Sequence, residues 1–453
     1  MTSEALDFAP TRAFLDAVLD EFDDLGAAGG GAVDPAARRA AFERYAAASR
    51  RREAYPRRWR HDYARLTFDD LRWSSGRARV PVLPRHVAAS GSGAGDAPAL
   101  AVENAGGIVH LGSTYLEPAR RTGDPRVTLL ALADARRAAR ARVDAVAGRI
   151  VAAEADRFTA LAAAFQNCGA FVDVPAGAAV DAPLQLIWSS RPGEASAVFP
   201  HTIVRVGEGA RAAIVERHVG STESFVCGTV EIDLAAGAHL DYTVVQQADE
   251  GARIIVRRGA RCGAGARIGW HVADLGGALV RTTIDVDLAG ERAEAALHAL
   301  FFARDFGHVD LAANLDHRAS ATRSLTVVRS AASGRGIGRF RGSVAVRSGT
   351  RGCDASMRDD ALVLSRDAYL EAVPALDIAT DDVAAHHAAT VGALDEEELF
   401  YVQSRGIARG RAERMIALAF FEPAIARFPS DALRDEVRTA LDAELDEVPE
   451  TFL

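Results

Sequence analysis

Two adjacent histidines, His386 and His387, stand in the stretch DDVAAHHAATVG (residues 381–392) and are candidate metal ligands. A neutral imidazole is a ligand for iron, zinc or copper. In an extended segment two adjacent rings point in opposite directions, so at most one of them faces a given site. The same residues are also compatible with a polar turn ahead of a helix. The local pattern therefore leaves a ligand role and a structural role both open.

The four cysteines are far apart in sequence and form no CxxC pair, which argues against a disulfide framework or a self-contained zinc site. They lie within or beside apolar strand segments, where a cysteine behaves as a small core residue. Cys353, in the polar stretch RGCDAS, is the one that we expect to be most accessible. The other three are Cys168, Cys227 and Cys262.

Two further motifs have simpler structural interpretations. The glycines of GRGIGRFRG (334–342) do not fit GxGxxG, and a strand pattern follows them, so we predict a β-turn. In HVDLAANLDH (308–317) the period of a strand places three polar residues on one face and His317 on the other. We interpret that segment as the polar outer face of a strand. The three are His308, Asp310 and Asp316.

The charge pattern excludes several classes of protein. The net charge is −9, and all 53 basic residues are arginines, so a P-loop lysine and a Schiff-base lysine are both excluded. The arginines between residues 50 and 60 are interrupted by other residues and predict a solvated helix face, not a nucleic-acid site. No segment has the length of a membrane span, and no signal peptide begins the chain. We expect a cytoplasmic protein.

The hydrophobic period divides the chain into three parts. Helical spacing predicts one helix at 14–25, a second that begins after an Asp34 cap with Pro35 at N1, and a third at about 131–166. Between the second and third helices we expect a flexible connector at 90–98 and a hairpin at 100–111 whose turn is Asn104–Gly107. From about residue 168 the period is two, as in LVRTTIDVDL (279–288), with short turn clusters between strands. This pattern indicates a sandwich, a barrel or a parallel β-helix, and irregular turns favour stacked rungs. Helical spacing returns after about 394 and predicts a helix behind Ser430, with Leu433, Val437, Leu441 and Leu445 on one face.

The segment LDIATDDVAAHHAATVGALDEEELFYVQSRGI (376–407) closely resembles the carboxy-terminal signature of the SufB/SufD family, the scaffold proteins of the SUF iron–sulfur cluster assembly system. Residues 158–186, 309–325 and 339–346 also resemble family segments, so the likeness covers about 156–428. It implies a mainly β protein with a right-handed parallel β-helix core, flanked by N-terminal and C-terminal helical regions. The implied division is 1–155, 156–390 and 391–453.

The resemblance also implies partners. SufB and SufD pair through their β-helices, and each binds the ATPase SufC through its C-terminal helices. This chain would then be a non-catalytic scaffold in a SufBCD complex, and SufC would hydrolyse ATP. Ala388 stands where SufB has a glutamate, and Asp359 where SufB has a cysteine, so the chain is most similar to SufD. A SufB-like or self-pairing homodimeric scaffold is the alternative. A stand-alone β-helix enzyme acting on polysaccharide is more remote and requires a groove of carboxylates and aromatics.

The site residues follow from the same resemblance. His387 aligns with the family histidine at the SufB–SufD interface, where it would contact a transient cluster shared with SufB, because an imidazole can replace a cysteine ligand. His386 replaces a serine and Ala385 a cysteine of some relatives, so His386 and Cys353 are secondary candidates. We expect no cofactor held stably by this chain alone, and a flavin in the whole complex stays open. SufC docking would involve the helix with Glu397, Phe400, Tyr401 and Arg405, whose acidic residues also suit a helix start.

Overall fold

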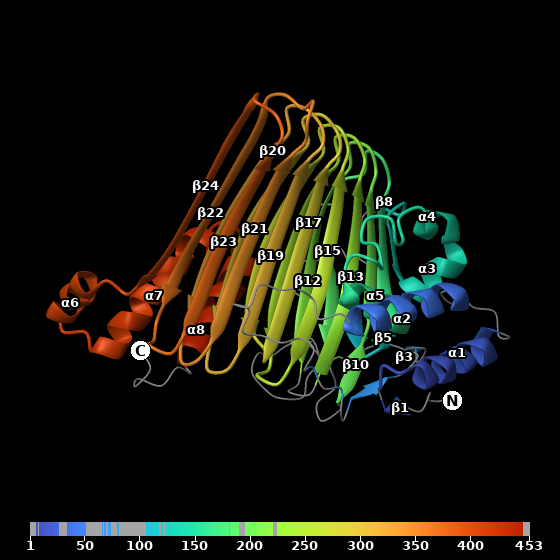
Figure 1. The fold of residues 1–453 in the computed structure, drawn as a ribbon, viewed down its shortest axis with the longest axis horizontal. Coiled ribbons are helices and arrows are strands. Elements are labelled where there is room, and N and C mark those ends of the chain that lie inside the picture. Colours follow the sequence, from blue (N-terminus) through green and yellow to red (C-terminus); the bar gives the residue numbers. More distant parts are fainter. Residues whose placement is uncertain are drawn as a thin grey trace.

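The computed structural model of the chain is a long β-helix with helices at both ends (Figure 1). It describes residues 6–7, 9–26, 34–50, 66, 68, 71–73, 79–80, 106–116, 119–120, 124–180, 182–189, 195–220 and 224–446. Most of the arginine run at 50–60 and the connector predicted at 90–98 lie outside these ranges. In the described part, no helix is long and apolar enough to cross a membrane.

The strands alternate between two sheets as the chain advances, so each strand pairs in parallel with the one two positions later. This arrangement confirms the predicted parallel β-helix, because each turn of the solenoid places one strand in each sheet. The last rung is formed by β23 (Tyr369–Ile378) and β24 (Val383–Ala393), which end the two sheets.

The first sheet, sheet A, contains β1 (Leu6–Asp7), β2 (Arg72–Trp73), β7 (Thr128–Ala131), β8 (Cys168–Val174), β10 (Ser196–Val198), β11 (Pro200–Val206), β13 (Ser224–Leu234), β15 (Arg253–Cys262), β17 (Leu279–Leu288), β19 (His308–His317), β21 (Ile337–Val346) and β23. The second, sheet B, contains β3 (Arg79–Val80), β4 (Gly106–Leu111), β5 (Thr114–Leu116), β6 (Ala119–Arg120), β9 (Leu184–Ser189), β12 (Arg211–Gly220), β14 (His239–Ala248), β16 (Arg267–Gly276), β18 (Glu294–Ala303), β20 (Arg323–Ala332), β22 (Cys353–Val363) and β24.

The turns between rungs stack on one another through their backbones. Gly209, Gly237 and Gly265 all adopt φ of +64°, which glycine reaches without steric cost. The N–H of each donates to a carbonyl of the next turn, as from Gly209 to Ala236 over 2.9 Å. The short glycine-containing clusters in the sequence therefore mark the corners of successive rungs. The predicted turn at 334–342 is confirmed, since Gly334 has φ of +62° and β21 follows.

The interior of the solenoid is mainly apolar but contains a buried ionic network. Glu216 accepts hydrogen bonds from Tyr242 at 2.7 Å and from Arg258 at 3.0 Å, and it lies 2.6 Å from His218. All four side chains are at most 2% exposed. Burial alone would raise the pKa of Glu216, but the Arg258 charge and the bond to His218 outweigh burial and hold that pKa far below its ordinary value. The carboxylate is thus ionised inside the protein.

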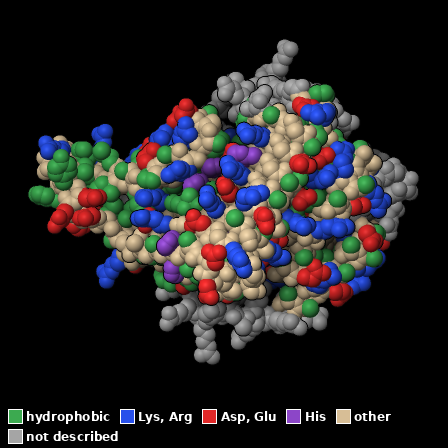
Figure 2. All heavy atoms as spheres, turned by 90° about the horizontal axis from the view of Figure 1, so that it is seen from above, with side chains coloured by type: hydrophobic (Ala, Val, Ile, Leu, Met, Phe, Trp, Pro, Cys, Tyr) green, Lys and Arg blue, Asp and Glu red, His purple; other side chains and the backbone are tan. Residues whose placement is uncertain are grey.

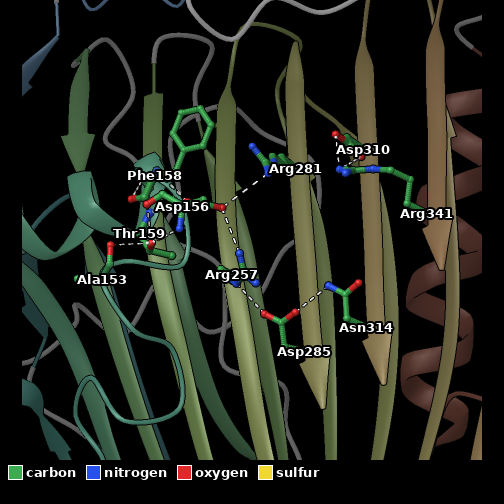
Figure 3. Close-up of polar contacts among 11 residues, drawn as sticks. Ala153, Asp156, Phe158, Thr159, Arg257, Arg281, Asp285, Asp310, Asn314 and Arg341 are labelled. Carbon is green, nitrogen blue, oxygen red and sulfur yellow. Dashed lines mark hydrogen bonds and ion pairs between the residues drawn. The ribbon is translucent and has the colours of Figure 1, made fainter. Parts of the chain in front are cut away.

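The outer face of sheet A carries a ladder of polar side chains that joins several rungs (Figure 3). Arg257 bonds to Asp285 at 2.6 Å and contacts Asp156 at 3.3 Å, and Asn314 donates to the same Asp285 at 2.8 Å. Asp310 binds Arg341 further along and is fully buried, as is His317 on the opposite face. The segment 308–317 is thus a strand with polar residues on both faces, more buried than its sequence predicted.

Helices cover the N-terminal end. α1 (Arg12–Gly26) and α2 (Pro35–Arg50) confirm the first two predicted helices, and Asp34 caps the second by accepting from the N–H of Ala36 at 3.0 Å. The third prediction, a helix over 131–166, is wrong in its middle. The structure has α3 (Leu132–Ala138), α4 (Arg140–Asp144) and α5 (Arg157–Phe165), separated by a loop.

A buried carboxylate explains that loop. Glu231 of β13 accepts hydrogen bonds from the N–H groups of Gly148, Arg149, Ile150 and Val151, at 2.7 to 3.2 Å. Those donors would lie inside a continuous helix, so the loop replaces helical bonds with bonds to Glu231. The partner lies 80 residues downstream or more, beyond the reach of a local pattern.

The hairpin prediction at 100–111 is also wrong in its turn. Gly106 and Gly107 begin β4, and the chain turns at Gly112, with φ of +62°, to pair antiparallel with β5. Residues 100–105 lie outside the described ranges. β4 pairs in parallel with β9 and so joins sheet B of the solenoid.

The C-terminal helices are α6 (Glu396–Ser404), α7 (Arg409–Ile425) and α8 (Asp431–Asp446). α7 and α8 pack on the outer face of sheet B through a cluster of apolar side chains from both layers. The predicted face of α8 is confirmed, because Leu433, Val437, Leu441 and Leu445 are buried and the hydroxyl of Ser430 accepts from the N–H of Leu433 at 3.3 Å.

Candidate functional site

The two histidines of the opening motif lie on β24, at the end of sheet B. Both are exposed. His387 stands opposite Met357 and His386 opposite Ser356 on the neighbouring strand. Residues directly opposite in a parallel pair share a face, and Met357 belongs to the core inside the solenoid. His387 therefore lies on the inward side at the open end of the β-helix, and His386 on the outward side. Of the two possibilities that the sequence left open, a polar turn is excluded, because this segment is a strand.

A buried acid lies in the same row of inward-facing side chains of sheet B as His387, called the inward row below. Asp359 of β22 is 1% exposed, and neither of its carboxyl oxygens has a hydrogen-bond partner among the described residues. Burial, and next the nearby Asp360, raise its pKa from 3.8 to about 7. Asp359 faces Ala389, two residues beyond His387, so the acid and the imidazole are diagonal neighbours on adjacent strands. The sequence located Asp359 but gave no sign that it is buried.

The open end of the solenoid exposes both backbone and apolar side chains. Among the described strands, β23 and β24 each pair on one side only, so their other edges present backbone N–H and C=O groups. Val373 and Ile378 on β23 and Val391 on β24 are 43%, 36% and 50% exposed. An edge with exposed valines and no covering helix is suited to strand addition by another chain.

The prediction that Cys353 is the accessible cysteine is wrong. Its side chain is 2% exposed because Cys353, at the start of β22, is on the inward row. Its Sγ lies 3.4 Å from the hydroxyl of Thr322, which is itself 2.8 Å from His317. Cys168 is the partly exposed one, and burial raises the pKa of its thiol. Burial likewise raises the pKa of Cys262 to about 12, so these thiols are protonated at neutral pH.

The second predicted surface, on α6, projects from the end of the molecule (Figure 1). Phe400 is 73% and Tyr401 60% exposed, although both are large aromatic residues. Arg405 follows the helix, with its guanidinium 5.1 Å from the centre of the Tyr401 ring and a 3.1 Å bond to the Tyr401 hydroxyl. Asp395 caps the helix by accepting from the N–H of Glu397 at 2.8 Å, which confirms a capped acidic helix start.

The projecting end combines two kinds of side chain. Figure 2 shows hydrophobic and acidic side chains side by side on the part that extends farthest from the body. Within α6 only Leu399 is buried, while Glu396, Glu397 and Glu398 are exposed. Little in this chain holds α6 against the solenoid, so its aromatic side chains face outward. Exposed aromatics beside charges are typical of a protein interface.

Among the residues that the structure describes, no group of three or more His, Cys, Asp or Glu side chains is arranged to hold a metal ion. His387 with Asp359 would therefore provide only part of a ligand set. A complete set would need donors from outside the described part of this chain.

Comparison with known proteins identifies the class. The model of the SUF system FeS cluster assembly, SufBD core domain matches residues 188–420, which is just over half of the 453 residues. A Mycobacterium leprae protein named as an iron–sulfur cluster assembly SufBD family protein is 31% identical over 264 residues, which cover 58% of this chain and 30% of that protein. A Staphylococcus epidermidis protein of the same family name is 29% identical over 285 residues, which cover 62% of this chain and 61% of that protein.

The chain belongs to the SufBD family of iron–sulfur cluster assembly proteins. The match spans less than two thirds of the length of these relatives. Their names state the family without distinguishing SufB from SufD.

Proposed function

We propose that this chain is a non-catalytic, SufD-like scaffold subunit. It pairs with a SufB-like paralogue through the open end of its β-helix and with the ATPase SufC through α6. The observation that carries the proposal is the uncovered last rung, β23 and β24, with His387 on its inward row. A partner that continues the two sheets would place its own ligands next to this imidazole.

SufD is favoured over SufB by Asp359. The position where SufB carries a cysteine holds a buried carboxyl group here, so a thiolate ligand is missing from this subunit. A SufB partner would supply the thiolates, and His387 would add a nitrogen ligand to a cluster that is held transiently.

Within the described part of the chain, the exposed aromatics and carboxylates do not support the polysaccharide-enzyme alternative. Among the described residues, the aromatic side chains with strong exposure are Phe306, Phe400 and Tyr401, one on a turn and two on α6. The outer face of sheet B is covered by α7 and α8, and carboxylates on sheet A such as Asp285 and Asp310 are bonded to arginines. A self-pairing homodimer through the same open end remains the nearer alternative.

Two single substitutions test the two proposed interaction surfaces independently. In co-expression with SufB and SufC of the same organism, Val391→Arg places a charge on the edge strand and is expected to remove SufB while SufC still co-purifies. Phe400→Ala is expected to remove SufC while SufB stays bound. The controls are Leu325→Arg, an exposed leucine on an interior strand, and Phe306→Ala, a phenylalanine with the same 73% exposure as Phe400. Equal losses for a variant and its control would contradict the assignment of that surface.

A further inference from the structure

A cavity at the N-terminal end of the molecule lies apart from both surfaces described above. Its volume is about 400 Å³, within the size range of small-molecule sites. The wall is formed by α2, α3, α4, α5 and the strands β11 and β13, which Figure 1 shows together beside β8. The charged side chains in the wall are Asp34, Arg136, Arg140, Asp144, Arg149, His201 and Glu231.

The three carboxylates in this wall are already bonded. Asp34 accepts from the N–H of Ala36 as the cap of α2, and Asp144 pairs with Arg140 at 3.3 Å. Glu231 accepts from four backbone N–H groups and lies 2.8 Å from Nε2 of His201. Burial alone would raise the pKa of Glu231, but the bonds from His201 and the loop outweigh burial and lower it. These anions are therefore satisfied without a ligand.

Arg136 is a charged group of this wall that keeps an unsatisfied hydrogen-bond donor. It is half-buried on α3, and its Nε atom is buried and makes no hydrogen bond within the described part of the chain. Burial lowers the pKa of Arg136; Asp144 and Glu231 partly oppose this, and the charge of Arg140 adds to it. A guanidinium that is desolvated without a bonded anion is unfavourable unless an anion reaches it.

A second buried arginine lies close behind Arg136. Arg38 of α2 is 2% exposed and donates to the carbonyl oxygens of Ala164 at 2.9 Å and Gln166 at 2.7 Å. Burial, followed by the charge of Arg136, lowers the pKa of Arg38 to about 9. The two cations thus repel each other. An anion at Arg136 would reduce this repulsion.

We infer that this cavity is a binding site for the oxyanion group of a small molecule, either a phosphate or a carboxylate, with Arg136 as its principal ligand. Arginine is suited to such groups because its planar fork of donors matches two oxygens at once. Arg140, which pairs with Asp144, and His201, which lies against Glu231, line the same cavity and offer further nitrogen donors. The site does not depend on the proposed scaffold role, because it uses neither the open end of the β-helix nor α6.

The test is calorimetric titration of the full chain at neutral pH and constant ionic strength, with pyrophosphate, inorganic phosphate and citrate as probes and chloride as the reference anion. We expect saturable binding of at least one probe at a single site. Preference for pyrophosphate would assign a phosphate ligand, and preference for citrate a carboxylate ligand. Absence of saturable binding by all three probes would overturn the inference.

The matched variants are Arg136→Gln and Arg137→Gln, which each remove one positive charge from α3. Arg137 is exposed, pairs with Asp134 and does not line the cavity. We expect Arg136→Gln to weaken binding by roughly tenfold or more, as for the loss of a charge-assisted bond. Arg137→Gln is expected to change binding by less than about twofold, the size of a screened surface effect. Equal weakening by both variants would show non-specific attraction and overturn the site.

A labelling experiment on the unaltered chain covers the case in which Arg136→Gln does not fold. Phenylglyoxal modifies accessible arginines, and peptide mass spectrometry reads the rate at each position. The oxyanion is expected to slow modification of Arg136 while that of Arg137 is unchanged. Protection of neither residue, or of both alike, would contradict the inference.

Discussion

At the scale of single residues, the inward row at the end of sheet B distinguishes the two histidines. His387 shares a face with Met357, whereas His386 shares one with Ser356, so only His387 is placed at the mouth of the solenoid. The sequence supplied both histidines and their spacing. It did not show which one faces inward, because the local pattern was also compatible with a turn and gave neither the strand nor its register.

We predict that His387→Ala reduces cluster formation by the complex of this chain with SufB and SufC several-fold, because an imidazole is a replacement for a thiolate ligand. His386→Ala is the matched control and is expected to leave cluster formation unchanged. The measurement is anaerobic reconstitution, followed by the visible absorbance of the cluster and by iron and sulfide content. A normal yield with His387→Ala would remove this residue from the site.

Asp359 makes a prediction about pH and stability. Its folded pKa of about 7 lies above the ordinary 3.8, so the folded chain binds more protons than the unfolded chain between these values. The free energy of unfolding of the unaltered chain should therefore fall, relative to Asp359→Asn, as pH rises from about 4 to about 7, by up to roughly 4 kcal/mol. Chemical denaturation across this pH range measures the difference.

Substitution of the neighbouring Asp360 is a control for which we expect the opposite dependence of stability on pH. Burial would raise its pKa, but the bonds from Arg358 at 2.8 Å and Thr390 at 2.7 Å outweigh burial and lower it. Asp360→Asn should therefore lose stability at neutral pH, and the loss should disappear as pH falls through the acidic range. If both variants responded to pH in the same direction, the assignment of a neutral Asp359 would be wrong.

At the scale of elements, the period of two predicted the strands and favoured stacked rungs, the family resemblance selected the β-helix, and the 3.6 period predicted α1, α2 and α8. These elements are built from local patterns and their own caps. The loop at 145–156 was missed because its backbone donors bind Glu231, which is distant in sequence. The turn of β4 was missed because its pairing with β9 determines where the strand begins.

We predict that Glu231→Ala destabilises the protein by about 3 kcal/mol or more, since it leaves four buried or partly buried backbone N–H groups without their acceptor. The matched control is Glu208→Ala, which removes an exposed carboxylate from a turn between rungs. Thermal unfolding and amide hydrogen exchange should show loss of protection at Gly148–Val151 in the first variant and none in the second. Unchanged protection in Glu231→Ala would mean that this loop is held by other contacts.

At the scale of the whole molecule, the two ends of the solenoid differ. Helices close the N-terminal end, and α7 and α8 cover one outer face, while the last rung and α6 stay uncovered (Figure 1). The sequence predicted this order of regions and the family. It did not predict the unpaired edges of β23 and β24, because the end of a sheet is a property of the assembled fold.

The most direct test of the scaffold role is the mass of the complex formed when this chain is co-purified anaerobically with the SufB and SufC of the same organism. Light scattering, together with subunit ratios from native mass spectrometry, measures it. The proposed function predicts one copy of this chain with one SufB and two SufC. Recovery of this chain apart from both proteins, alone or as a pair with itself, would contradict the scaffold role proposed here.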